Sequence, residues 1–328
     1  MRYYINKVGF LLISIWAAMT INFVLPRMMP GNPAEIIFGK FQGRLQPSAL
    51  HAMMIEFGFS NAPWYVQYFQ YLGNVITGHF GISYSYFPVH VKTIIEQSLP
   101  WTIGAVGIAT LLAAVIGTFG GIFIAWIRGS FLEKAIPIVG MFFQATPANW
   151  TAFMLLFFFG FDLSIFPMYH GFGSDVNPGF NWPFISSVID HGVLPVATVF
   201  LTGVSGWIVG MRANMINTLG EDYVIFAEAK GVSKARLMFS YTARNALLPQ
   251  VTSLAIAIGM IVNGSILMET EFSYPGIGFQ LNNAVSGEDY PMVQGMFLII
   301  ALCVLFANFI VDLLYSRLDP RVRTGGAN

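Results

Sequence analysis

Residues 101–127 read WTIGAVGIATLLAAVIGTFGGIFIAWI, and none of these 27 residues carries a charge. As a helix the stretch would be about 40 Å long, whereas the hydrocarbon core of a bilayer is about 30 Å thick. The whole chain shows the same bias. Of its 328 residues 55% are hydrophobic and 10% are charged, against roughly 25% charged residues in soluble domains. The composition therefore predicts a multi-pass membrane protein.

Other runs of similar length, uncharged except for Asp312 in the last of them, predict further membrane spans. Together the six runs cover residues 8–25, 101–127, 136–161, 193–211, 247–268 and 292–314. The expected fold is an all-α membrane protein with six transmembrane helices. The first run has the position of a signal peptide, but no small-residue cleavage site closes it. We therefore expect it to be a retained anchor.

Lys and Arg residues are distributed unevenly between the two sides of this topology. With the N-terminus inside, twelve of them fall in inner segments and four in outer segments. Basic residues concentrate on the cytoplasmic side of membrane proteins, so the bias predicts cytoplasmic N- and C-termini. The formal net charge is zero, and no basic excess points to a nucleic-acid partner.

A long segment, 29–100, separates the first two runs and is predicted to lie outside. It contains the aromatic residues Trp64, Tyr65, Tyr68, Phe69 and Tyr71. Rings of this kind gather where a membrane meets water. We interpret 29–100 as an external accessory segment with interfacial aromatics.

The inner loop between the fourth and fifth runs predicts two short helices joined at a glycine. Thr218 and Glu221 have the spacing of a capping box for the first helix. Gly231 can take the left-handed conformation that ends it, and Ser233 can cap the second helix, which is expected to run to Pro249. From this pattern alone the loop could dock on another protein or lie on the lipid surface.

Motifs spread along the chain resemble the permeases of binding-protein-dependent ABC importers, in the dipeptide and oligopeptide form. The inner-loop part of the resemblance is Glu221-Asp-Tyr-Val224, Ala227-Glu-Ala-Lys-Gly231 and Ala243-Arg-Asn-Ala-Leu-Leu-Pro249. The other motifs, in chain order, are Met29-Pro-Gly-Asn-Pro33, Gly78-His-Phe-Gly-Ile82, Phe272-Ser-Tyr-Pro-Gly-Ile-Gly278, Asp289-Tyr-Pro291, Val311-Asp-Leu-Leu-Tyr315 and Leu318-Asp-Pro-Arg321. Ile225 and Phe226 depart from the broad importer motif, which has Glu-Ala there.

The resemblance implies a type I ABC importer permease fold in the cytoplasmic (inner) membrane. It divides the chain into an N-terminal transmembrane helix (1–28), the external segment (29–100), a core permease domain (101–316) with a coupling loop at 218–246, and a cytoplasmic tail (317–328). The implied partners are a second homologous permease, two cytoplasmic ATPases and an external substrate-binding protein. The coupling residues it implies are Glu221, Ala227, Glu228, Ala229, Lys230, Gly231, Ser233 and Arg236.

We expect no catalytic residue and no cofactor on this chain. It has no Gly-x-x-x-x-Gly-Lys-Ser/Thr phosphate loop, so ATP and Mg²⁺ are expected on the partner ATPases. Its five His and one Cys have no metal-ligand spacing. Gly203-Val-Ser-Gly206 matches an intramembrane serine protease pattern, but every His precedes Ser205 and lies in an outer segment. Close packing between helices explains Gly203 and Gly206 better than protease chemistry does, and it is also expected at Gly117 and Gly121.

Position selects candidates for the translocation path. Trp207, Met211 and Asn263 lie within predicted spans. Glu269 and Glu271 close the fifth run at its outer end, where they could face the substrate path or simply end the helix at the interface. Asp312, near the inner end of the last run, is expected to pair with a basic residue such as Arg317.

Three substrate classes remain open, with peptides first, oligosaccharides second and nickel chelates third. An ion-coupled secondary transporter is the competing class, although neither inverted repeats nor broken helices with charged midplane sites are evident from the sequence.

Overall fold

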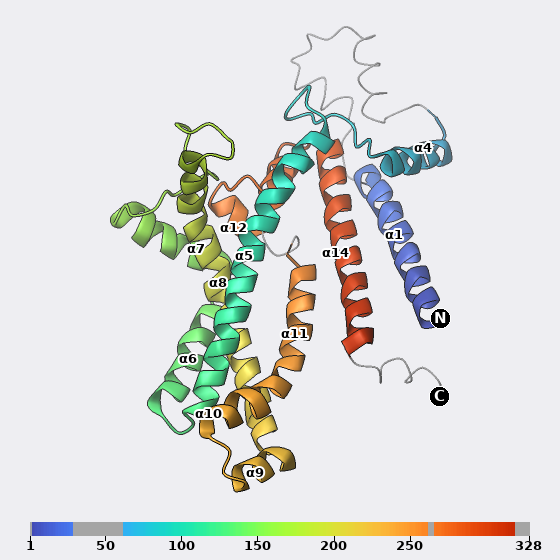
Figure 1. Ribbon diagram of the computed structural model, residues 1–328. Coiled ribbons are helices and arrows are strands. Elements are labelled where there is room, and N and C mark those ends of the chain that lie inside the picture. The colour runs from blue at the N-terminus through green and yellow to red at the C-terminus, as the bar shows by residue number, and fades with distance from the viewer. Residues whose placement is uncertain (1, 29–61, 262–265, 319–328) are drawn as a thin grey trace. The chain divides into compact units, whose positions relative to one another are not determined.

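The computed structural model describes residues 2–28, 62–261 and 266–318, and these are helical for most of their length (Figure 1). An isolated bridge joins Ile82 to His90, and no β-strand occurs in these ranges. The chain divides into two compact units. The first comprises residues 1–101 and 275–328, and the second comprises residues 102–274.

Four helices of the described ranges are long and apolar enough to cross a membrane. They are α1 (Arg2–Met28), α5 (Val91–Trp126), α8 (Trp182–Leu219) and α14 (Tyr290–Leu318). They contain the predicted runs 8–25, 193–211 and 292–314, and all of 101–127 except its last residue. Two of the helices begin about ten residues before the predicted runs. For α8 the reason is local, because the Asn181 side chain accepts a hydrogen bond from Phe184 N–H (2.9 Å) and caps the helix there.

The predicted third span is not one uninterrupted helix. It is divided into α6 (Phe131–Ala145) and α7 (Ala148–Leu155), which continues as the π-helical turn η1 (Leu156–Asp162). Pro147 explains the break, because the residue before a proline is pushed out of the helical region. Thr146 accordingly has an extended backbone (φ −77°, ψ 129°).

The predicted fifth span is covered in two pieces by α11 (Arg244–Gly259) and α12 (Ile266–Glu271). The intervening residues 262–265 lie outside the described ranges. The remaining helices are α4 (Trp64–Thr77), α9 (Asp222–Ala229), α10 (Lys234–Arg236) with its π-helical continuation η2 (Leu237–Ala243), and α13 (Ile277–Ser286).

In the first unit α1 and α14 pack antiparallel and are joined by polar contacts at both ends. Lys7 Nζ lies 2.6 Å from Asp312 Oδ2. Near the other end Asn22 donates to the Gln294 carbonyl (2.9 Å), and the Gln294 side chain donates back to the Asn22 carbonyl (3.1 Å). Asp312 therefore pairs with a basic residue, Lys7 of α1. The side chain of Arg317 lies outside the described residues.

A buried carboxylate joins the segment before α5 to the start of α14. Asp289 is fully buried. It accepts hydrogen bonds from the Ser83 hydroxyl, from Ser85 N–H (2.8 Å) and from Met292 N–H (3.2 Å). A carboxylate with this many donors holds the two segments together as one piece.

In the second unit α8 is the central helix, with α6, α7 and α11 packed against it. The close packing predicted for Gly117 and Gly121 is confirmed. A Cβ atom on Gly117 would lie 2.4 Å from Trp207 Cβ, and one on Gly121 would lie 2.5 Å from Met211 Cβ. Since these residues have no side chain, the backbones of α5 and α8 approach each other directly.

Candidate functional site

The candidate site is the inner-loop knob, which we define as residues 220–243 between α8 and α11. The chain leaves α8 at Leu219, turns at Gly220 and enters α9 at Asp222. After α9 it turns again over residues 230–233 and enters α10. Figure 1 shows α9 and α10 at one end of the second unit, beyond the end of α8.

Gly231 takes the left-handed conformation that its position predicted, with φ +80°. Its N–H donates to the Glu228 carbonyl (2.9 Å), and Val232 N–H donates to the Ala227 carbonyl (3.2 Å). These bonds satisfy carbonyls at the end of α9 that would otherwise have no helical partner. An added Cβ on Gly231 would meet no atom within 4 Å. The requirement for glycine therefore comes from the backbone angle and not from crowding.

A small apolar core makes the knob rigid. Val224 and Ala227 of α9 are buried against Leu237 of η2. Leu219, Val232 and Tyr241 pack around these three residues. Because both short helices contribute to this core, α9 and η2 are held together as one body that continues from the end of α8.

Tyr223 adds a polar tie between the knob and α11. Its hydroxyl accepts a hydrogen bond from the Asn245 amide (2.6 Å) and lies 3.4 Å from the Tyr241 carbonyl. This tie fixes the start of α11 to α9 across the knob.

The outer surface of the knob carries exposed apolar side chains. Ile225 is 53% exposed and Phe226 is 62% exposed. Lys230 Nζ lies 4.4 Å from the centre of the Phe226 ring, which places a cation over an aromatic face. Of the eight predicted coupling residues Ala227 is buried in the small core, and the other seven are exposed, namely Glu221, Glu228, Ala229, Lys230, Gly231, Ser233 and Arg236.

Three local predictions about the knob were wrong. Thr218 does not form a capping box, because it lies within α8 and its hydroxyl donates to the Asn214 carbonyl (2.8 Å). Ser233 precedes α10 at the capping position, but its side chain makes no capping bond. The second helix does not stop at Pro249, because α11 continues through that residue to Gly259.

An ion pair at the base of the knob was not found from the sequence. Glu133 of α6 is buried and accepts hydrogen bonds from the Arg212 guanidinium of α8 and from Gly129 N–H. Ser130 and Glu133 do have capping-box spacing, and Ser130 Oγ accepts from Glu133 N–H (3.2 Å). The spacing of Ser130 and Glu133 indicates from the sequence that a helix starts there. No residue near Glu133 in the sequence indicates that its ion-pair partner is Arg212.

The apolar packing above this ion pair joins three helices. Met211 and Met215 of α8 are buried with residues from the end of α5 and from the η2–α11 junction. The further members of this cluster are Ile122, Ala125, Ala243 and Ala246. The knob is therefore continuous with the packed ends of α5, α8 and α11.

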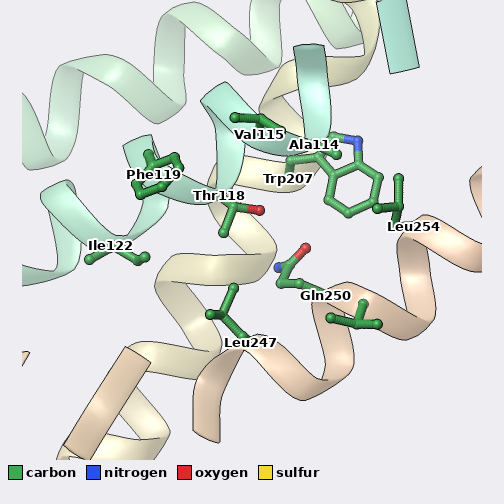
Figure 2. A pocket seen from close by; sticks show the side chains of 10 residues that line it. Ala114, Val115, Thr118, Phe119, Ile122, Trp207, Leu247, Gln250 and Leu254 are labelled. Carbon is green, nitrogen blue, oxygen red and sulfur yellow. The ribbon is translucent and has the colours of Figure 1, made fainter. Parts of the chain in front are cut away.

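The residues predicted for the translocation path lie in different environments. Trp207 lines a pocket of about 220 Å³ between α5, α8 and α11, together with Thr118 and Gln250 (Figure 2). The rest of its lining is apolar and contains no charged residue. Met211 belongs to the packed cluster and has no exposed surface.

Two of the other predicted path residues, Glu269 and Glu271, belong to α12. Glu269 is fully buried and accepts a hydrogen bond from the Thr102 hydroxyl (2.6 Å). Glu271 is half-buried. Asn263 lies outside the described residues.

Ser205, of the protease-like motif, is fully buried against Gly140. Among the described residues no cluster of three His, Cys, Asp or Glu could hold a metal ion.

Comparison with known proteins identifies the family. Residues 117–324 match the model of the binding-protein-dependent transport system inner membrane component. A di/tripeptide transport system permease protein of Pseudomonas aeruginosa is 30% identical over 97% of both chains. A putative peptide permease protein of Brucella suis is 32% identical, and an oligopeptide transport system permease protein of Bacillus subtilis is 30% identical, each over 98% of this chain and 99% of the relative. The chain is therefore a multi-pass inner-membrane protein of the binding-protein-dependent transport system inner membrane component family.

Proposed function

We propose that this chain is one permease subunit of an ATP-driven importer of short peptides, and that the knob at 220–243 docks on a cytoplasmic ATPase. The observation that carries the docking proposal is the geometry of the knob. A rigid two-helix body continues from a membrane-length helix and presents Ile225 and Phe226 outward. Exposed apolar side chains on a well-packed surface are typical of a protein-binding site.

The names of the relatives support peptides as the substrate. The Pseudomonas relative is named for di/tripeptides, the Bacillus relative for oligopeptides and the Brucella relative for peptides. All three match nearly the full length of the chain, so the similarity is not confined to a shared coupling segment. Oligosaccharide and nickel uptake have no comparable support among these three relatives.

The proposed topology has six crossings with both termini in the cytoplasm, in a type I permease fold. The four membrane-length helices supply the first, second, fourth and sixth crossings. The third would be made by α6 with α7 and η1, and the fifth by α11 with α12. Broken helices are tolerated within a membrane where neighbouring protein satisfies the freed backbone groups. The domain division proposed from the sequence is kept, with a helix at 1–28, an external segment at 29–100, a permease core at 101–316 and a tail at 317–328.

In the proposed complex this chain pairs with a second permease, two ATPases bind from the cytoplasm, and a binding protein delivers peptide from outside. The chain itself has no enzymatic role, and ATP with Mg²⁺ is bound by the ATPases. Reversing a two-state conformation from 1:99 to 99:1 requires about 5.5 kcal/mol of differential binding. Exposed ion pairs contribute about 0–1 kcal/mol each, so charges such as Glu228 and Lys230 are too weak to transmit the change. Packing through the small core and the Glu133–Arg212 pair is the stronger route.

Five residues are proposed for the peptide path in this complex. Trp207 is the best supported, because it lines a pocket whose Thr118 and Gln250 could form hydrogen bonds to a peptide backbone. Met211, Asn263, Glu269 and Glu271 remain proposals from their position in the sequence.

Site-directed crosslinking tests the docking proposal. A cysteine replaces the exposed Ala229 in a Cys303→Ser background, and a matched control carries the cysteine at the exposed Asn74 of α4. Both are treated with a thiol-attached photo-crosslinker in membranes containing the assembled transporter. We expect Ala229→Cys to crosslink to a nucleotide-binding subunit and Asn74→Cys not to do so. Crosslinks from position 229 to lipid alone would refute the docking role.

Copurification separates the importer from an ion-coupled secondary transporter. The importer should be recovered with ATPase subunits and a second permease. Gradient-driven uptake by this chain purified alone would instead favour the secondary transporter.

A further inference from the structure

Helix α4 (Trp64–Thr77) has an apolar face that no other described element covers. The helix contains no Asp, Glu, Lys or Arg, and none of its residues is buried. Tyr65 is 53% exposed, Phe69 is 69% exposed and Ile76 is 80% exposed. At about 100° per residue these three side chains fall within a sector of about 40° on the helix. They form one continuous stripe, which we call the outer stripe.

A second face of α4 is attached to α1. The Tyr68 hydroxyl lies 2.7 Å from the Thr20 hydroxyl, and the Asn22 amide donates to the Tyr71 hydroxyl (3.1 Å). The Phe23 ring packs between both tyrosines, with centroid distances of 5.2 Å and 5.5 Å. The attachment therefore uses a side of α4 that is centred about 110° from the outer stripe.

The attachment fixes the level of α4 relative to the bilayer. The membrane-length part of α1 is Ile5–Val24. Thr20, Asn22 and Phe23 all lie in the final turns of that part. A helix tied to these residues lies where α1 leaves the hydrocarbon core. Figure 1 shows α4 running across the end of α1 and not continuing it.

The third face of α4 is polar. Gln70, Asn74 and Thr77 are exposed, and at about 100° per residue their sector is centred about 130° from the outer stripe. A helix that lies in the plane of an interface needs an apolar face toward lipid and a polar face toward water. The outer stripe of α4 supplies the apolar face, and the side with Gln70, Asn74 and Thr77 supplies the polar face.

We propose that α4 is an interfacial helix whose outer stripe lies in the headgroup–acyl boundary of the lipid bilayer, on the side where α1 ends. The occupant of the stripe is lipid because α4 is tied to the last turns of a membrane-length helix that itself presents apolar side chains outward. Trp16, Ile21 and Val24 are exposed on the membrane-length part of α1. The absence of charge on α4 argues against a salt-bridged protein partner and indicates binding that does not require anionic lipid. The aromatic residues Tyr65 and Phe69 suit this boundary.

The chain after α4 is consistent with this anchoring role. Gly78 takes a left-handed conformation (φ +73°) and ends the helix, with its N–H donating to the Val75 carbonyl (3.1 Å). The chain then reaches the segment held by Asp289 at the start of α14. Helix α4 thus links the ends of α1 and α14 that lie on the same side of the membrane.

Spin-label accessibility tests the proposal and does not depend on the importer assignment. Single cysteines at Phe69 and Ile76, in a Cys303→Ser background of the full-length chain, carry a nitroxide in vesicles of neutral phosphatidylcholine. Oxygen partitions into lipid, whereas a nickel chelate stays in water. Labels at Asn74 and Trp16 are the controls for the polar face of α4 and for the hydrocarbon core.

We expect the ratio of oxygen to nickel collisions at positions 69 and 76 to be several-fold higher than at 74 and to lie between the values at 74 and 16. Two results would overturn the proposal. A ratio at 69 and 76 equal to that at 74 would place the outer stripe in water. Low collision rates with both reagents would place it under protein. Ile76 is the more exposed of the two positions, so its substitution provides a second reading with little effect on folding.

Discussion

Replacing Gly231 provides the sharpest test of the knob, because the cost of the change can be worked out from the structure. At φ +80° an L-residue with a Cβ atom is strained by about 1–2 kcal/mol, and a β-branched residue is strained more than others. The turn is held by two backbone hydrogen bonds, from Gly231 and Val232 N–H, each worth about 0.5–1.5 kcal/mol net. Since the strain is comparable to what holds the turn, Gly231→Val should loosen it.

A change of one or two kcal/mol corresponds to a factor of about 5–30 in a conformational equilibrium. We therefore expect Gly231→Val to lower peptide uptake per ATP hydrolysed by roughly this factor, while the ATPases continue to turn over. Both quantities can be measured together in vesicles that contain the permeases, the ATPases and the binding protein. Uptake per ATP equal to that of the wild-type transporter would refute the reasoning.

Two further variants separate backbone strain from other causes. Gly231→Asn should retain most of the coupling, because Asn tolerates the left-handed region. If Asn is as damaging as Val, the cause is the approach of a partner surface and not the backbone angle. Gly78→Val is the matched control. Gly78 also has positive φ (+73°) with no atom within 4 Å of an added Cβ, but it lies at the end of α4, so this variant should remain coupled.

The remaining predictions concern the three carboxylates that the structure pairs. Glu133→Gln should lower the thermal melting temperature, because it removes the anion that pairs with the Arg212 guanidinium. Asp289→Ala leaves three donors without their acceptor and should destabilise the chain by about 1–3 kcal/mol per buried orphaned group, measured by melting and by protease cleavage within 81–90. Asp312→Asn should have a small effect of about 0–1 kcal/mol because its pair with Lys7 is partly exposed, and a melting shift larger than this would indicate a further role for the pair.

The sequence predicted the membrane class and much of the helical framework because these depend on composition and on local pattern. An uncharged run such as 101–127 has to be a membrane or core helix whatever its neighbours are. The break at Pro147 was not predicted, because hydrophobicity and charge define a span without regard to the backbone restriction that a proline places on the residue before it. The early start of α8 was missed for a related reason. The helix begins after the Asn181 cap, whereas the apolar run from which the span was predicted begins only at residue 193.

At the knob, the left-handed conformation of Gly231 was predictable because it is set by residues within five positions of the turn. The capping role given to Thr218 was also a local inference, and it failed because α8 continues through this position. A hydroxyl inside a helix bonds to the carbonyl four residues back, as Thr218 does to Asn214. The spacing between Thr218 and Glu221 was correct for a capping box, but the helix boundary was not.

Pairs of charged residues were the least predictable feature, because their partners are set by helix packing and not by sequence distance. Arg212 and Glu133 are 79 positions apart, and Lys7 and Asp312 are 305 positions apart. Met211 shows the same dependence. Its place within a span made it a candidate for the path, yet Gly121 lets the backbones of α5 and α8 approach so closely that Met211 is fully buried between them. Since Arg212 is the next residue along α8, the close approach that buries Met211 also positions the cation for Glu133. The packing of α5, α6 and α8 is therefore the feature that makes the base of the knob rigid.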